Sequence, residues 1–183
     1  MNRIKRISLY FRFLFQMLLI ALPILLIAAW LQSTGEIVLL GGTININFIP
    51  KAYTSNVLHQ LNNLERILAL GVSAIPMIIN LYILFSLIKL FRLYEQEEIF
   101  SLNNVRYIRN IGYALLVTQL INPFYEALMG FVLTWRNPPG QRFASASLDQ
   151  TNIGIILIAL IVVLISWIMT EGCKLREEQQ FTV

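Results

Sequence analysis

Four long apolar stretches alternate with shorter polar ones along this chain of 183 residues. A hydrocarbon layer about 30 Å thick is crossed by about 20 helical residues, and a helix satisfies its own backbone polar groups there. The pattern therefore predicts an all-α membrane protein built as a bundle of four transmembrane helices. The apolar runs are Phe13–Leu31, Leu70–Phe91, Tyr107–Trp135 and Ile153–Thr170.

The spans divide the chain into a single membrane domain with alternating outer and inner connections. We place the spans at residues 13–31, 70–91, 107–135 and 153–172. The connections are then 32–69 on the outside, 92–106 in the cytoplasm and 136–152 on the outside, followed by a cytoplasmic tail at 173–183. Because Pro138, Pro139 and Gly140 interrupt the second outer connection, we expect an irregular loop there.

The first outer connection contains the signature of a small β-hairpin. Two strand-like runs, Glu36–Leu40 and Thr43–Phe48, flank the dipeptide Gly41-Gly42, which accepts the positive φ angles of a tight turn. The second run alternates apolar and polar residues, so one face should pack and the other should face water.

The rest of this connection, residues 54–69, has helical periodicity. Thr54 or Ser55 is a candidate N-cap, and leucines follow at positions 58, 61, 64 and 68. We expect an amphipathic helix that lies at the membrane interface or runs directly into the second span. The single histidine, His59, has no neighbouring ligand residue and favours a solvated side chain over a metal site.

Composition and charge agree with a membrane location. The chain is 57% hydrophobic and 13% charged, which excludes an ordinary soluble domain. If the amino terminus is cytoplasmic, ten of the 14 basic residues fall inside and four outside, so the positive-inside rule places both termini in the cytoplasm. This orientation also explains the net charge of +4 without direct nucleic-acid binding. The outer four are Lys51, Arg66, Arg136 and Arg142.

A basic start before an apolar run is also found in signal peptides. Here the run covers about 19 residues, longer than a signal h-region, and Ala28-Ala29-Trp30 is a poor cleavage context, so we expect a retained helix. Cys173 is the only cysteine, which rules out an intramolecular disulfide; a plain apolar cysteine is favoured there over a lipidated one.

Polar residues inside the third span form the main candidate site. Gln119, Asn122 and Glu126 follow an i, i+3, i+7 spacing and share one face, which should look inward because a lipid-facing acid is costly. Asn80 of the second span falls at a similar depth, with Ser73 near Glu126 and Ser166 near Gln119 as expected hydrogen-bond partners. Such contacts set helix rotation in the favoured interpretation; a proton- or ligand-linked role for Glu126 is the alternative.

The inner connection is the second candidate site. Its mixed charge is typical of a solvated turn and also permits a cytoplasmic partner to dock. The residues of this candidate partner surface are Glu95, Glu97, Glu98, Phe100, Arg106 and Arg109.

Catalytic motifs are absent from the sequence. There is no P-loop, no Gly-rich dinucleotide fingerprint, no His-Glu-x-x-His, no cysteine pair and no supported serine–histidine arrangement. We therefore expect neither an enzyme nor a cofactor or metal site.

Short motifs in the inner half resemble the DUF2975 family of small bacterial four-span membrane proteins. The first lies around the inner connection, at Glu98-Ile-Phe-Ser101, Asn104 and Ile108-Arg-Asn-Ile-Gly112. The second is the ending, with Glu171-Gly172, Leu175-Arg-Glu-Glu178 and Phe181-Thr-Val183. The resemblance implies no reaction or cofactor. It implies, by association, a small helix-turn-helix regulator as a partner.

Together these features favour a non-catalytic interaction or regulatory component that contacts the lipid bilayer and a membrane-protein partner or a second copy of itself. Two alternatives remain open. One is a small transporter or channel subunit that uses the polar intramembrane face, and the other is an accessory subunit of a larger membrane complex.

Overall fold

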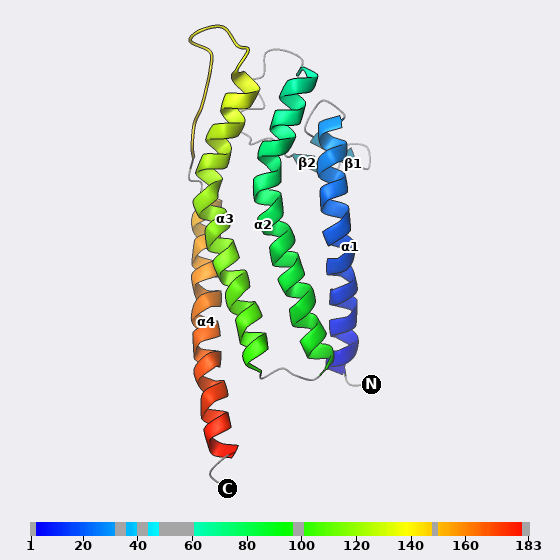
Figure 1. Cartoon of the computed structure of the whole chain (residues 1–183), viewed down its shortest axis with the longest axis vertical. Coiled ribbons are helices and arrows are strands. Elements are labelled where there is room, and N and C mark those ends of the chain that lie inside the picture. Colours follow the sequence, from blue (N-terminus) through cyan, green and yellow to red (C-terminus); the bar gives the residue numbers. More distant parts are fainter. Residues whose placement is uncertain are drawn as a thin grey trace. The chain divides into compact units, whose positions relative to one another are not determined.

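The computed structural model describes residues 3–31, 36–39, 44–47, 61–96, 101–147 and 150–180. Four long helices dominate this part of the chain, together with one pair of short strands (Figure 1). In chain order the elements are α1 (Arg3–Leu31), β1 (Glu36–Leu39), β2 (Ile44–Asn47), α2 (Asn63–Glu95), α3 (Leu102–Thr134) and α4 (Gln150–Gln180).

All four helices are long and apolar enough to cross a membrane. Their most apolar windows have mean hydropathies of 2.5, 2.2, 1.3 and 2.9 in chain order. At 1.5 Å per residue, helices of 29 to 33 residues are about 45–50 Å long, more than a hydrocarbon layer requires. The protein is therefore a multi-pass membrane protein whose helices extend beyond the apolar runs.

The two strands fall within the runs that flank Gly41 and Gly42. They pair antiparallel, with Glu36 opposite Asn47 and Leu39 opposite Ile44. The turn between them, residues 40–43, lies outside the described residues, as do residues 54–60 of the predicted amphipathic helix.

Helix α2 begins later than the leucine periodicity predicts. Leu61 is not helical, because Asn62 caps the helix. The Asn63 amide donates to Asn62 Oδ1 at 2.7 Å, and the Asn62 amide donates to Glu65 Oε2 at 2.8 Å. The bond from the Asn62 amide to Glu65 is one half of a capping box and marks the start of the helix. The prediction of a helix that includes Leu61 is wrong, and from Asn63 the helix runs directly into the second span.

The chain packs as two compact units. The first comprises Met1–Leu19, Ile79–Gln119 and Asp149–Val183, and the second comprises Ile20–Ile78 and Leu120–Leu148. Helices α1, α2 and α3 each contribute one half to each unit, and α4 belongs to the first.

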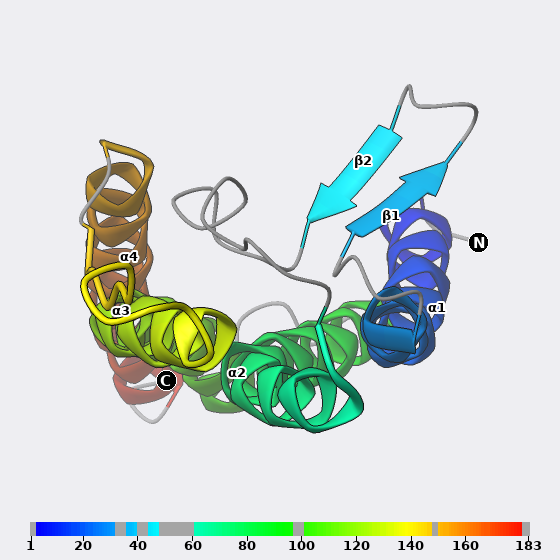
Figure 2. The same ribbon diagram turned by 90° about the horizontal axis from the view of Figure 1, so that it is seen from above.

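In the first unit, α1 lies beside α2 and α4 lies beside α3 (Figure 2). Aromatic rings join α1 to α2, with Phe11 stacked on Phe91 at 5.3 Å between centroids and Phe15 tilted against the same ring at 5.5 Å. Where α3 meets α4, the backbones approach closely at Gly112. A Cβ there would lie 2.7 Å from Val163 Cγ2.

In the second unit, the core forms around one large side chain. Trp30 of α1 is 2% exposed, and its indole Nε1 donates to Ser73 Oγ of α2 at 3.2 Å. Met129 and Leu133 of α3 are fully buried. Buried tryptophan needs such a partner for its N–H, so this bond fixes how α1 and α2 face each other.

Candidate functional site

Glu126, the acid of the predicted intramembrane site, is held by three hydrogen bonds. Its Oε1 accepts from Asn122 Nδ2 at 3.1 Å, one helical turn earlier. Its Oε2 accepts from the Ser147 amide at 2.9 Å and the Ser147 hydroxyl at 2.7 Å. Hydrogen bonds to a carboxylate are short and strong. The chemistry of this arrangement is that of an anchor. It attaches the loop of residues 135–147, which the sequence predicts to be the second outer connection and which we name the outer loop, to α3.

More contacts attach this loop to the C-terminal end of α3. The Phe143 amide donates to Thr134 Oγ1 at 3.0 Å, and that hydroxyl lies 2.8 Å from the carbonyl oxygen of Gly130. Asn137 Nδ2 donates to the carbonyl oxygen of Gln141 at 3.0 Å. The loop is irregular, as the sequence predicts, and it returns along α3 as far as Glu126.

The surroundings of Glu126 within the second unit are its own helix and the loop that follows α3. Its side chain is half-buried. The two carboxylate oxygens bond to Asn122 of α3 and to Ser147 of the loop.

The expected partner of Glu126, Ser73, is engaged elsewhere. Its hydroxyl accepts from Trp30 and also hydrogen-bonds Tyr125 of α3. Tyr125 lies next to Glu126 on the helix but points its hydroxyl towards α2. Counting residues along the spans predicted the wrong hydrogen-bond partner for Glu126, because side chains at the same depth can point in different directions.

The other two members of the predicted polar face belong to the first unit. Gln119 is 7% exposed, and its Oε1 has no hydrogen-bond partner among the described residues. The hydroxyl of Ser166 donates to the Val163 carbonyl of its own helix at 2.7 Å, so it does not serve Gln119 as predicted. Asn80 is exposed on α2. The structure therefore joins Asn122 to Glu126 and gives Gln119 and Asn80 separate surroundings.

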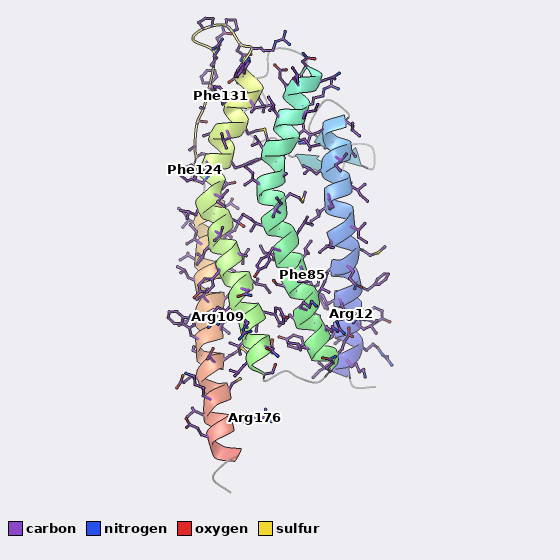
Figure 3. The ribbon with its side chains drawn as sticks, in the orientation of Figure 1. Arg12, Phe85, Arg109, Phe124, Phe131 and Arg176 are labelled. Carbon is purple, nitrogen blue, oxygen red and sulfur yellow. The ribbon has the colours of Figure 1, made fainter. Side chains whose placement is uncertain are left out.

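At the C-terminal end of α2, Glu95 forms an ion pair and is not exposed on the predicted partner surface. Its Oε2 lies 3.0 Å from Arg12 Nη1, and the two side chains are 14% and 32% exposed. Arg106 is exposed on α3, and Arg109 is half-buried there. Figure 3 shows Arg12 and Arg109 at the same end of α1 and α3. The predicted members Glu97, Glu98 and Phe100 lie outside the described residues.

Sequence reasoning missed a buried acid in the first turn of α2. Glu65 is 5% exposed, caps α2 through Asn62, and places Oε1 3.9 Å from Arg136 Nε at the end of α3. The spacing Asn62-x-x-Glu65 is a capping-box pattern and signals this role in the sequence. The pair with Arg136 gives no such signal, because it joins residues far apart in the chain.

No three His, Cys, Asp or Glu side chains gather as potential metal ligands within the described ranges. His59 is not among those residues. The thiol of Cys173 is buried in α4.

The motif residues near the inner connection have structural roles. Ser101 caps α3, since its hydroxyl accepts from the Asn104 amide at 3.2 Å. Asn104 is fully buried. Gly112 allows α3 and α4 to approach, because the Ala159 carbonyl oxygen and Val163 occupy the space of a side chain.

Comparison with known proteins gives one match. The family described as "Protein of unknown function (DUF2975)" matches residues 49–183, which cover α2, α3 and α4 and include all the motif residues. No curated protein and no solved structure matches the chain. Because the match covers well over half of the sequence, the chain belongs to the DUF2975 family.

Proposed function

We propose that this protein is a non-catalytic interaction or regulatory component of the bacterial inner membrane, and that its cytoplasmic end binds another protein. The observation that carries the proposal is the end of α4. Within the first unit, this helix continues past the ends of α2 and α3, and Arg176 lies on the projecting part (Figures 1 and 3).

The projecting part of α4 differs from the rest of the helix. The apolar run ends at Thr170, yet the helix continues to Gln180, about 15 Å further. Charged side chains and one leucine are exposed on it, and Leu175 is 55% exposed. We name this set the inner surface; it consists of Glu171, Lys174, Leu175, Arg176 and Glu178, all exposed, together with exposed Arg106 of α3.

Orientation supports a cytoplasmic partner for the inner surface. The excess of basic residues at this end of the helices favours the cytoplasmic side. An apolar side chain among charges of both signs is suited to a protein partner, with the leucine as anchor and the charges giving specificity. The resemblance described above implies a small helix-turn-helix regulator, and we propose that class of protein as the partner.

The polar groups of the membrane face support this function over transport. Glu126 and Asn122 bond to each other and to Ser147, so they act on the outer loop. A permeation path would need such groups to line an open route. The expectation of a protein without catalysis or cofactor belongs to the same proposal.

Co-purification tests the proposal. The native chain is extracted in mild detergent after cross-linking in its host, and co-purifying chains are identified. The test variant carries Leu175→Ser and Arg176→Glu, and the matched control carries Arg142→Glu on the outer loop. We expect one partner in fixed ratio with the native and control chains and at least a tenfold loss with the test variant.

Two outcomes would overturn the proposal. In the first, the partner stays bound to the Leu175→Ser, Arg176→Glu variant while the control also retains it. In the second, the chain purifies only with copies of itself, which would favour a homo-oligomeric transporter or channel.

A further inference from the structure

A groove opens between the outer ends of α2 and α3, within the second unit. Its volume is about 540 Å³, which is in the range of small-molecule binding sites. We name it the outer groove. It is lined by Asn62, Leu64, Glu65, Leu68, Phe131, Val132, Trp135 and Arg136. Phe131 is labelled near the outer end of α3 in Figure 3.

The lining of the outer groove combines a long apolar wall with one charged pair. Leu64, Phe131 and Trp135 contribute large apolar side chains that are 69%, 51% and 59% exposed. At the end of α3, Arg136 faces the buried carboxylate of Glu65. An apolar slot with a cation at one end fits an amphiphile that has an acyl chain and an anionic headgroup.

The position of the outer groove along each helix points to the membrane interface. Counting about 20 residues outward from Arg109 on α3 reaches Met129, and the same count from Lys89 on α2 reaches Ala69. The groove begins one or two residues beyond these positions, at Leu68 and Phe131, and reaches the level of the headgroups at Arg136. Tryptophan is enriched in this layer, as Trp135 illustrates. Exposed apolar side chains at this level are not covered by the hydrocarbon layer, so another apolar group should cover them.

Arg136 has donors available for an anionic headgroup. Its Nε is 3.9 Å from Glu65 Oε1, and 55% of its side chain is exposed. Glu65 is occupied by the Asn62 amide and by Arg136, so its charge is offset. A guanidinium is a planar fork that matches phosphate oxygens. The described side chains of the second unit contain three arginines against two glutamates, which also favours an anion.

From this geometry we propose that the outer groove binds one anionic phospholipid of the outer leaflet. An acyl chain occupies the slot along Leu64, Leu68 and Phe131, and the phosphate bonds to Arg136. Bulk lipid would cover the helices without regard to headgroup, whereas this site selects negative charge. The inference does not depend on the proposed function, because it concerns the opposite end of the helices.

Lipid retention tests the proposal. The protein is reconstituted in vesicles of equal phosphatidylglycerol and phosphatidylcholine, extracted in mild detergent, and weighed by native mass spectrometry. We expect one retained phosphatidylglycerol per chain. Val132→Trp, which fills the groove, should lower retention at least fivefold, whereas the matched change Leu160→Trp on the exposed face of α4 should not.

The headgroup is tested separately by Arg136→Gln, with Arg142→Gln of the outer loop as its control. The first variant should retain both lipids equally, and the control should keep the preference for phosphatidylglycerol. Retention of no lipid by the native chain, equal retention of both lipids, or unchanged retention by Val132→Trp would each overturn the site. Because Arg136→Gln alters only a partly exposed side chain, it keeps the test valid if Val132→Trp fails to fold.

Discussion

At the scale of single residues, the acid in the third span acts as an anchor for the outer loop. Glu126 uses one carboxylate oxygen for Asn122 and the other for Ser147. A carboxyl group near the end of a span is costly unless such donors reach it. The loop supplies those donors, so the acid and the loop stabilise each other.

Two substitutions of Glu126 should distinguish the effect of its shape and polarity from the effect of its charge. Glu126→Gln keeps an acceptor for Ser147, and Asn122 can present its own oxygen to the new amide, so we expect the fold and the loop to be retained. Glu126→Leu removes the acceptor and should cost about 1 kcal/mol per hydrogen bond lost. The expected result is faster hydrogen exchange at the Ser147 amide in Glu126→Leu, measured in a lipid-reconstituted sample, with Glu126→Gln as the control.

A proton-linked role for Glu126 predicts a different result. Glu126→Gln would then fold normally yet abolish a pH-dependent response that the native chain shows in liposomes. If Glu126→Leu leaves both thermal stability and Ser147 exchange unchanged, the anchor assignment is wrong.

Residue pairings were the part of the site that the sequence could not predict. The i, i+3, i+7 spacing correctly placed Asn122 and Glu126 on one face, because helical geometry is local. It could not show that Ser147, which lies 21 positions from Glu126, returns to that face. The ion pair of Arg12 and Glu95 was missed for the same reason, since neither residue belongs to a periodic pattern from which its partner could be predicted.

At the scale of elements, the helices were predictable and their ends were not. Apolar runs of about 20 residues locate spans because the membrane requires that length. Beyond those runs, capping decides where helices begin. Asn62 and Glu65 start α2, and Ser101 starts α3. Within the predicted inner connection, 92–106, residues 92–95 and 102–106 are therefore helical, since α2 continues to Glu95 and α3 begins at Leu102.

The crossing of α3 and α4 depends on the lack of a side chain at Gly112. A Cβ would meet Val163 Cγ2 at 2.7 Å and the Ala159 carbonyl oxygen at 3.3 Å, so the helices would have to move apart. We expect Gly112→Ala to lower the thermal stability of the detergent-solubilised protein, with a cost of about 1–3 kcal/mol for overpacking.

The matched control is Gly71→Ala in α2, where nothing lies within 4 Å of the new Cβ. Alanine is the better helix former, so this change should leave stability unchanged or raise it by up to about 1 kcal/mol. Equal effects of the two substitutions would show that close packing at Gly112 is not required.

At the scale of the whole molecule, the two ends of the helices have different proposed partners. The inner surface, on the projecting part of α4 and on α3, is assigned to a cytoplasmic protein. The outer groove, between α2 and α3, is assigned to an anionic lipid. Both assignments require the orientation that the basic residues predict, with ten inside and four outside.

Cysteine labelling tests that orientation most directly. In a Cys173→Ala background, Ala144→Cys is placed on the exposed outer loop and Arg176→Cys on the projecting part of α4. Spheroplasts are treated with a membrane-impermeant maleimide, and permeabilised samples serve as the control. The account predicts that Ala144→Cys reacts in intact spheroplasts and that Arg176→Cys reacts only after permeabilisation. Reaction of Arg176→Cys in intact spheroplasts, with Ala144→Cys protected, would contradict both the orientation and the cytoplasmic partner.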